Sequence, residues 1–320
     1  MVIDTDDSSI NGLIFKELIK RGYSLDGDRK IWNIADSKLW YLTSEQAQAY
    51  LDLENSKKSG DSMINVEIDF LKKVMPEISD EVLEGDEITL IDIGCGDGKK
   101  AVVPINYIKQ KAKITYCPID ISSYMVEKAI KNISELKVNK VVNFKWNISD
   151  FENMENVTSL LRADGKKLFL LFLGGTIGNF EVHDALYSLR QSMEDGESLL
   201  LGVPINNTSE DEDPSKNYNS KSVDVFLGHV LKGIGFKKDE IKFGTRFKNF
   251  RVECFYTIQK KKIIHFNDKE IVFNVGDELI VAVSYKYSIS DYESSMKLYF
   301  SESKFFLNDE KSWALILCKK

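Results

Sequence analysis

Between residues 88 and 203 the chain alternates short apolar runs with segments of helical periodicity. Continuous apolar runs are typical of strands buried on both faces, and their alternation with helices is typical of parallel sheets. The pattern therefore predicts an α/β fold with a doubly wound parallel sheet. The predicted strands are 88–93, 114–119, 141–146, 167–173 and 198–203.

The flanking segments have a different pattern. We expect residues 1–61 to form short helices at 9–21 and 44–53, joined by a segment that contains Trp32, Trp40 and Tyr41. A further helix at 65–74 should end before Pro76, because proline lacks the backbone N–H that a helix interior requires.

Beyond residue 204 a helix is predicted at 222–234, with Gly235 as its C-terminal cap. Period-two alternation then predicts antiparallel strands, followed by a helix at 291–300 and two last strands that should close the large sheet as an antiparallel edge pair. The expected strands are 250–258, 261–265, 270–275, 278–287, 304–307 and 313–318. The character of the pattern therefore changes after the last strand of the alternating segment.

The first predicted strand runs into the glycine-rich sequence I-D-I-G-C-G-D-G-K-K, in which Gly94, Gly96 and Gly98 alternate with other residues. A strand, a tight glycine turn and a helix N-terminus let the backbone approach an adenosine-type ligand closely. The third glycine follows the second by two residues, which departs from the dinucleotide and phosphate-loop spacings. An ordinary tight turn between strand and helix is the alternative interpretation.

Acidic residues follow the next two predicted strands. Asp120 ends the second strand, where a carboxylate can accept hydrogen bonds from both hydroxyls of a ribose. After the third strand, Asp150 could accept from an adenine amino group while Phe151 covers the base. Asp150 alone could equally be the N-cap of a helix at 151–161. Glycines, an acid, and an acid with an aromatic ring at successive strand ends favour a nucleoside site.

The composition of the chain limits the classes of function that we expect for it. The apolar content is 43% and the net charge is −7, so the chain is typical of a globular protein and lacks the overall basic charge expected of a nucleic-acid binder. The four cysteines and three histidines are scattered without metal-ligand spacing, which favours a reducing compartment and no metal site. With neither a signal-peptide pattern nor a membrane span in the sequence, we expect a cytoplasmic protein. The oligomeric state is not indicated.

A family resemblance is carried by the glycine turn, which fits class I S-adenosylmethionine (SAM) methyltransferases, and by residues 171–179, L-F-L-G-G-T-I-G-N. The latter resembles the histidine-specific methyltransferase family of the ergothioneine pathway, which also includes fungal N-methyltransferases of tryptophan derivatives. The resemblance covers roughly residues 30–320. It implies a Rossmann-like SAM-binding domain of residues 62–203 plus 288–320 and a second, smaller α+β substrate-binding domain of residues 1–61 plus 204–287.

The resemblance also implies roles for individual residues. SAM contacts fall on Gly94, Lys100, Asp120 and the pair Asp150 and Phe151, and Gly96 and Gly98 complete the turn. The acceptor-facing residues correspond to Asn179, Tyr218 and Ser284, with Tyr218 aligned only loosely. Trp40 and Tyr41 are candidates for cation–π contact with an amine, or else core residues.

Two departures from the family pattern concern the acceptor. The tyrosine-proline-threonine-arginine segment of the family is replaced around residues 61–64, and the glutamate that would receive an imidazole is Ala282 here. The sequence therefore favours an N-methyltransferase for a small amino-acid-like or amine substrate other than histidine. Histidine N-alpha-methylation, methylation of a protein, peptide or nucleic acid, and SAM binding without catalysis are the alternatives.

Overall fold

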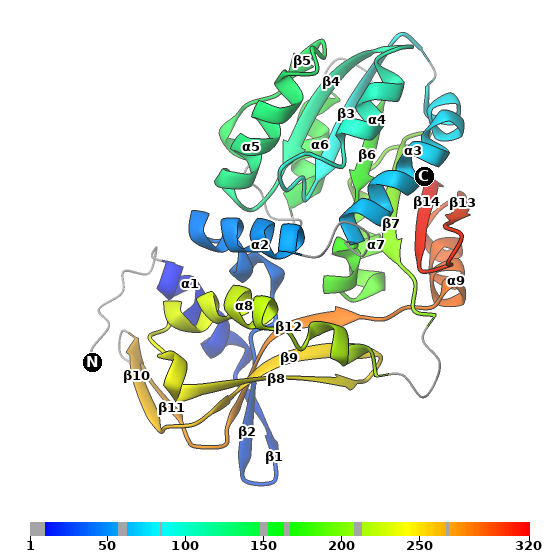
Figure 1. Cartoon of the computed structure of the whole chain (residues 1–320). Coiled ribbons are helices and arrows are strands. Elements are labelled where there is room, and N and C mark those ends of the chain that lie inside the picture. The colour runs from blue at the N-terminus through cyan, green and yellow to red at the C-terminus, as the bar shows by residue number, and fades with distance from the viewer. Residues whose placement is uncertain are drawn as a thin grey trace. The chain divides into compact units, whose positions relative to one another are not determined.

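The computed structural model describes residues 10–56, 63–83, 85–147, 153–162, 167–207, 213–266 and 269–320. These residues form two compact units, one within residues 1–56 and 208–285 and the other within 57–207 and 286–320. Each unit has its own sheet (Figure 1).

The larger unit is built on a seven-stranded sheet of order β13-β14-β7-β6-β3-β4-β5. The strands from β7 to β5 are parallel, and β14 and β13 are antiparallel to their neighbours. This confirms the predicted edge pair. The strands are β3 (Glu87–Ile93), β4 (Lys113–Ile119), β5 (Lys140–Val141), β6 (Leu168–Phe172), β7 (Ser198–Pro204), β13 (Glu302–Leu307) and β14 (Trp313–Lys319).

Helices cover both faces of this sheet (Figure 1). Ile91 of β3 belongs to the apolar cluster formed with α6, α7 and α9, whereas its neighbour Leu90 belongs to the cluster formed with α3, α4 and α5. Burial on both faces explains why the strands are continuously apolar. The helices are α3 (Met63–Val82), α4 (Val102–Ile108), α5 (Ser123–Ser134), α6 (Met154–Leu161), α7 (Val182–Gln191) and α9 (Ile289–Tyr299), with 3-10 turns η2 (Lys145–Asn147) and η4 (Thr176–Asn179).

The strand order reverses between β3 and β6, from which the chain proceeds to opposite edges of the sheet. In open α/β sheets, ligands bind outside the carboxyl ends of the strands at such a switch point. The doubly wound parallel sheet predicted from the sequence is thereby confirmed, and its switch point lies where the glycine turn follows β3.

The smaller unit contains a five-stranded sheet of order β1-β2-β12-β9-β8 and a separate β10–β11 ribbon. Helices α1 and α8 and the turn η1 pack on the sheet through one apolar cluster. Its elements are α1 (Ile10–Arg21), β1 (Tyr23–Asp26), β2 (Arg29–Asn33), η1 (Ser37–Trp40), α2 (Ser44–Ser56), η5 (Pro214–Tyr218), α8 (Lys221–Gly233), η6 (Lys238–Glu240), β8 (Ile241–Lys248), β9 (Arg251–Ile258), β10 (Lys262–Phe266), β11 (Lys269–Phe273) and β12 (Glu278–Tyr285). The cap predicted at Gly235 is confirmed by its φ of 89° and by its N–H donating to the Lys232 carbonyl at 3.0 Å.

The prediction that Pro76 ends a helix was wrong. Helix α3 continues to Val82 with Pro76 inside it. A proline at this position leaves the carbonyl of Lys72, four residues earlier, without its helical N–H partner. The hydroxyl of Tyr107 in α4 donates to that carbonyl at 3.1 Å. Tertiary packing thus supplies the hydrogen bond that the helix lacks.

One predicted strand needs correction, and three further strands were not predicted from the sequence. The predicted strand at 141–146 is reduced to Lys140–Val141, because the side-chain carbonyl of Asn147 accepts the N–H of Phe144 at 2.6 Å and stabilises a turn instead. The segment between the first two helices contains the hairpin β1–β2, whose turn includes Gly27 at φ 60°. Strand β8 was not predicted, and its alternate polar positions fit an edge strand.

Candidate active site

The glycine turn after β3 is fixed to the end of the neighbouring strand β4. The backbone N–H groups of Gly94 and Cys95 both donate to the Ile119 carbonyl, at 2.8 and 3.1 Å. Gly94, Gly96 and Gly98 have φ values of 65°, 52° and 78°, a region that glycine enters without steric cost. The turn conformation therefore depends on these glycines.

The second and third glycines of the turn have different surroundings. A Cβ atom added at Gly98 would lie 3.1 Å from the Cα of Ala129 in α5, so Gly98 allows close packing of the turn on that helix. A Cβ atom at Gly96 would meet no described atom within 4 Å. Gly96 therefore borders open space at the carboxyl edge of the sheet, where a ligand would approach the backbone.

The Asp120 carboxylate joins the glycine turn to the segment after β4. Its Oδ2 accepts the N–H of Gly96 at 3.1 Å, and its Oδ1 accepts the N–H of Ser122 at 2.9 Å. Burial raises the pKa of Asp120, whereas these backbone hydrogen bonds oppose the rise. Each carboxylate oxygen has a second lone pair, so Asp120 can still accept ligand hydroxyls.

A second buried acid, which the sequence did not single out, lies beneath the turn. Asp92 in β3 is 3% exposed, and the hydroxyl of Tyr116 in β4 donates to its Oδ2 at 2.7 Å. Burial raises the pKa of Asp92 to about 6. Its signal in the sequence was an acid within a largely apolar strand, two residues before the first glycine.

Lys100 lies against the end of β6. Its Nζ is 2.7 Å from the position that a Cβ of Gly174 would take, so only glycine leaves room for the ammonium group there. The Gly174 N–H donates to both carboxylate oxygens of Glu67, at 3.0 and 2.9 Å. Glu67 is fully buried, and a side chain at Gly202 would overlap it. Sequence reasoning missed Glu67 and Gly202, because their contacts join α3 to distant strands.

Asn179 lies at the end of η4, beside the glycine turn. Thr176 in the same turn is 3.8 Å from the position of a Cβ at Gly94. The Asn179 side chain is half-buried, and the described residues make no hydrogen bond with it. Its amide therefore offers a donor and an acceptor to a ligand at this edge of the sheet.

In the smaller unit the structure brings Tyr218 and Ser284 together. Their hydroxyl oxygens are 2.9 Å apart, and either can be the donor. Tyr218 ends η5, which is anchored where Asp213 accepts the N–H of Ser215 at 2.9 Å and where the Thr245 hydroxyl donates to the Ser215 carbonyl at 3.2 Å.

Ala282 precedes this serine on β12 and is 6% exposed within the apolar cluster of the unit. The pairing of β12 with β9 shifts between Ile280 and Ala282, which leaves Val281 in a bulge. The indole N–H of Trp40 donates to the Val281 carbonyl at 2.8 Å. Trp40 is therefore a core residue that fixes the bulge beside Ala282.

The predicted adenine contacts, Asp150 and Phe151, lie outside the described residues.

Within the described part of the chain, no group of three or more histidine, cysteine, aspartate or glutamate side chains could hold a metal ion. Among the described helices, none is both long and apolar enough to cross a bilayer.

Solved structures resemble the chain at low sequence identity. An S-adenosylmethionine-dependent methyltransferase from Clostridium acetobutylicum is 10% identical with a TM-score of 0.46, over 85% of this chain and 98% of that one. The protein PH0226 from Pyrococcus horikoshii is 11% identical with a TM-score of 0.44, over 87% of this chain and 99% of that one. DesVI from Streptomyces venezuelae is 10% identical with a TM-score of 0.39, over 88% of this chain and 99% of that one. No curated protein sequence matches the chain.

The family comparison is more specific. The model of the SAM-dependent, histidine-specific methyltransferase family matches residues 63–320. This match covers the seven-stranded sheet, the glycine turn and most of the smaller unit. The chain therefore belongs to the histidine-specific methyltransferase family and is a SAM-dependent methyltransferase.

Proposed function

We propose that this methyltransferase acts on the amine of a small amino-acid-like or amine substrate with an apolar body, rather than on free histidine. The observation that carries the proposal is the buried Ala282, which takes the place of the imidazole-binding glutamate in the family resemblance. A histidine side chain next to Ala282 would bury an N–H donor without that acceptor, at a cost of about 1–3 kcal/mol.

The donor side of the proposal rests on the glycine turn. We assign Asp120 to binding of the ribose hydroxyls of SAM and Lys100 to binding of its carboxylate. Gly96 would let the backbone approach SAM closely. Asp150 and Phe151 are assigned to the adenine by the resemblance alone. When bound, SAM supplies a methyl group on a sulfonium centre to a neutral nucleophile. The protein contributes mainly by positioning the reactants and excluding water.

The acceptor side rests on hydroxyl and amide groups. Tyr218 and Ser284 form a hydrogen-bonded pair that can hold an amine or carboxylate, and Asn179 offers both a donor and an acceptor. An ammonium group must lose its proton before attack; the proton would pass to water, and the hydroxyl pair could relay it. We assign substrate binding to the domain of residues 1–61 plus 204–287 and SAM binding to residues 62–203 plus 288–320.

The aromatic side chains of the smaller unit support the proposal that the substrate has an apolar body. Tyr41, Tyr50 and Phe226 form a cluster with ring centroids 5.2 to 5.9 Å apart. Tyr218 packs against the same apolar cluster that contains Ala282 and Phe226. Aromatic walls favour an aromatic acceptor and also a partly methylated, cationic amine.

Histidine remains the second candidate, because the description of the matched family specifies it. A peptide acceptor would also present an amine, but no contact among the described residues favours it. The acceptor class is tested by incubating the protein with labelled SAM and a panel of amino acids, amines, peptides and RNA. Mass spectrometry then locates the methyl group. Transfer to amine nitrogen of a small molecule supports the proposal, whereas transfer only to peptide or RNA contradicts it.

Asn179→Ala separates the two halves of the proposed site. Because Asn179 is assigned to the acceptor, the variant should methylate the identified acceptor more slowly while SAM affinity stays nearly unchanged. Calorimetric titration with SAM and initial rates with saturating SAM measure the two effects. Equal losses of SAM affinity and of turnover would contradict the assignment and would indicate that Asn179 shapes the donor pocket.

A further inference from the structure

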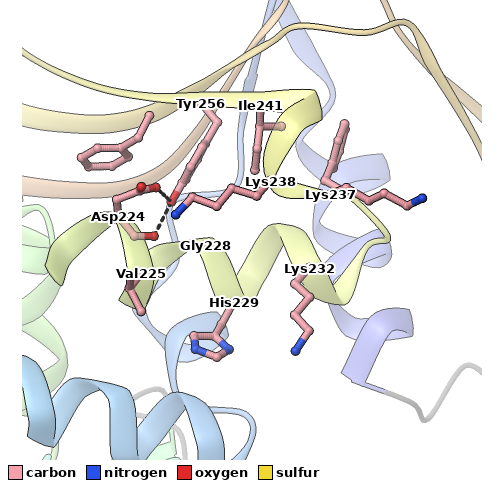
Figure 2. Close-up of a pocket in the computed structure, with 11 residues that line it drawn as sticks. Asp224, Val225, Gly228, His229, Lys232, Lys237, Lys238, Ile241 and Tyr256 are labelled. Atoms are coloured by element: carbon pink, nitrogen blue, oxygen red, sulfur yellow. Dashed lines mark hydrogen bonds between the residues drawn. The ribbon is translucent and has the colours of Figure 1, made fainter. Parts of the chain in front are cut away.

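A pocket in the smaller unit lies between helix α8, the connection from α8 to β8, and strands β8 and β9 (Figure 2). Its volume of about 460 Å³ is in the range of small-molecule sites. Tyr218 and Ser284, which we assign to the methyl acceptor, are not among the residues that line it. The lining residues are Asp224, Val225, Gly228, His229, Lys232, Phe236, Lys237, Lys238, Ile241, Phe243 and Tyr256.

The walls of the pocket are apolar and rigid. Phe236 and Tyr256 are 4% and 1% exposed, and the rings of Phe243 and Tyr256 lie 5.3 Å apart. A Cβ atom at Gly228 on α8 would lie 3.4 Å from the Tyr256 hydroxyl, so a larger side chain at this position would extend into the pocket beside Tyr256. The Tyr256 hydroxyl donates to the Asp224 carbonyl at 2.8 Å and is 3.0 Å from its Oδ1. A flat apolar group would therefore meet aromatic surfaces that are already held in place.

The polar groups at the pocket are mainly cationic. Lys232, Lys237 and Lys238 line it together with one carboxylate, Asp224. Lys238 extends along the pocket toward Tyr256 and Asp224, whereas Lys237 points the other way (Figure 2). No carboxylate of a described residue forms an ion pair with any of the three lysines.

The carboxylates next to Lys237 and Lys238 in the sequence form ion pairs with other lysines. The Asp239 Oδ2 is 2.5 Å from the Nζ of Lys260, and the Glu240 Oε2 is 2.6 Å from the Nζ of Lys262. Asp239 and Glu240 are thus bound to lysines outside the pocket lining. Asp239 also attracts Lys237 electrostatically. The ammonium groups of Lys232 and Lys238 are therefore the ones available at the rim for an anion from solution, while the aromatic walls would take an apolar body.

We propose that this pocket binds a small organic anion with an apolar, ring-sized body. The anionic head, a carboxylate or a phosphate ester, would lie at the lysine rim near Lys238. The body would lie against Phe236, Phe243 and Tyr256. Because these residues are outside the proposed donor and acceptor sites, the proposal does not depend on the identity of the methyl acceptor.

The test uses three probes that share one ring system, namely 1-naphthoate, 1-naphthyl phosphate and the neutral 1-naphthylmethanol. Titration calorimetry with the whole protein should show saturable binding of at least one anion at one site. The neutral alcohol should bind about tenfold more weakly or worse, which corresponds to about 1.4 kcal/mol. The two anions distinguish a carboxylate site from a phosphate site. Absence of saturable binding by both anions, or equal affinity for the alcohol, would overturn the proposal.

Two variants locate the bound probe. Lys238→Gln should weaken anion binding about tenfold, and Gly228→Leu should abolish it by filling the pocket. Lys242→Gln is the matched control, because Lys242 is an exposed lysine on β8 that does not line the pocket. Thermal unfolding checks that each variant is folded. Anion affinity that stays unchanged in a folded Lys238→Gln variant, or that falls equally in the control, would contradict the assignment.

Discussion

At the scale of single residues, Asp120 has the most clearly defined hydrogen bonds in the proposed donor site. Both of its carboxylate oxygens accept backbone N–H groups, one from the glycine turn and one from Ser122. In Asp120→Asn the amide NH₂ would face one of these N–H donors, and the charged partner for a ribose would be lost. We expect SAM binding to weaken by about 1–3 kcal/mol.

Calorimetric titration with SAM measures this loss. Asp195→Asn is the control, since Asp195 is an exposed aspartate of the same unit. Unchanged SAM affinity in Asp120→Asn would remove Asp120 from the binding site, and an equal loss in the control would show that net charge causes the effect.

Asp92 makes stability depend on pH. Its pKa is about 6 in the folded protein against an ordinary 3.8, so the folded state binds this proton more tightly than the unfolded state does. Protonated Asp92 therefore stabilises the folded state relative to the ionised form. This stabilisation is complete below pH 3.8 and is lost as the pH rises through 6. Ionised Asp92 then costs the folded state about 3 kcal/mol.

Asp92→Asn should remove this cost while keeping an acceptor for the Tyr116 hydroxyl. The free energy of unfolding is measured for both proteins with denaturant and without SAM. The difference, variant minus original protein, should rise between pH 4 and pH 7. A difference that is constant over this range would show that Asp92 does not titrate as its burial indicates.

At the scale of elements, the glycine turn combines a ligand role and a packing role. Gly96→Val would place a branched side chain in the open space and in a disfavoured φ region, so we expect a folded protein without measurable SAM binding. Gly98→Ala would push the turn against Ala129 and should lower the unfolding temperature even without SAM. Thermal unfolding with and without SAM distinguishes the two. A folded Gly96→Val variant with normal SAM affinity would mean that the turn is only structural.

Elements with strong local signals were predictable from the sequence. The buried strands and the glycine turn were identified because burial on both faces leaves continuous apolar runs. The continuation of α3 through Pro76 could not be predicted, since it depends on Tyr107 from another helix. For the same reason, Glu67 showed no signal, because its partner Gly174 is distant in sequence. The hairpin did have a local signal, the Gly27-Asp28 pair that forms its two-residue turn.

At the scale of the whole molecule, the proposed donor and acceptor residues lie in two units, each with its own sheet and apolar core. The larger unit contains the glycine turn and Asp120, and the smaller unit contains Tyr218, Ser284 and Ala282. Family membership accounts for the first set, because all members share SAM as the methyl donor. The second set includes the departure from the family pattern, so the identity of the acceptor is the central question about this enzyme.

The most direct test of the proposed acceptor class is kcat/KM for free histidine, compared with aromatic and aliphatic amino acids and simple aromatic amines at saturating SAM. A missing acceptor for the imidazole N–H predicts that histidine is roughly 5- to 150-fold poorer than the best apolar amine, equivalent to about 1–3 kcal/mol. Efficient conversion of histidine to its trimethylated betaine, with apolar amines inactive, would contradict the account.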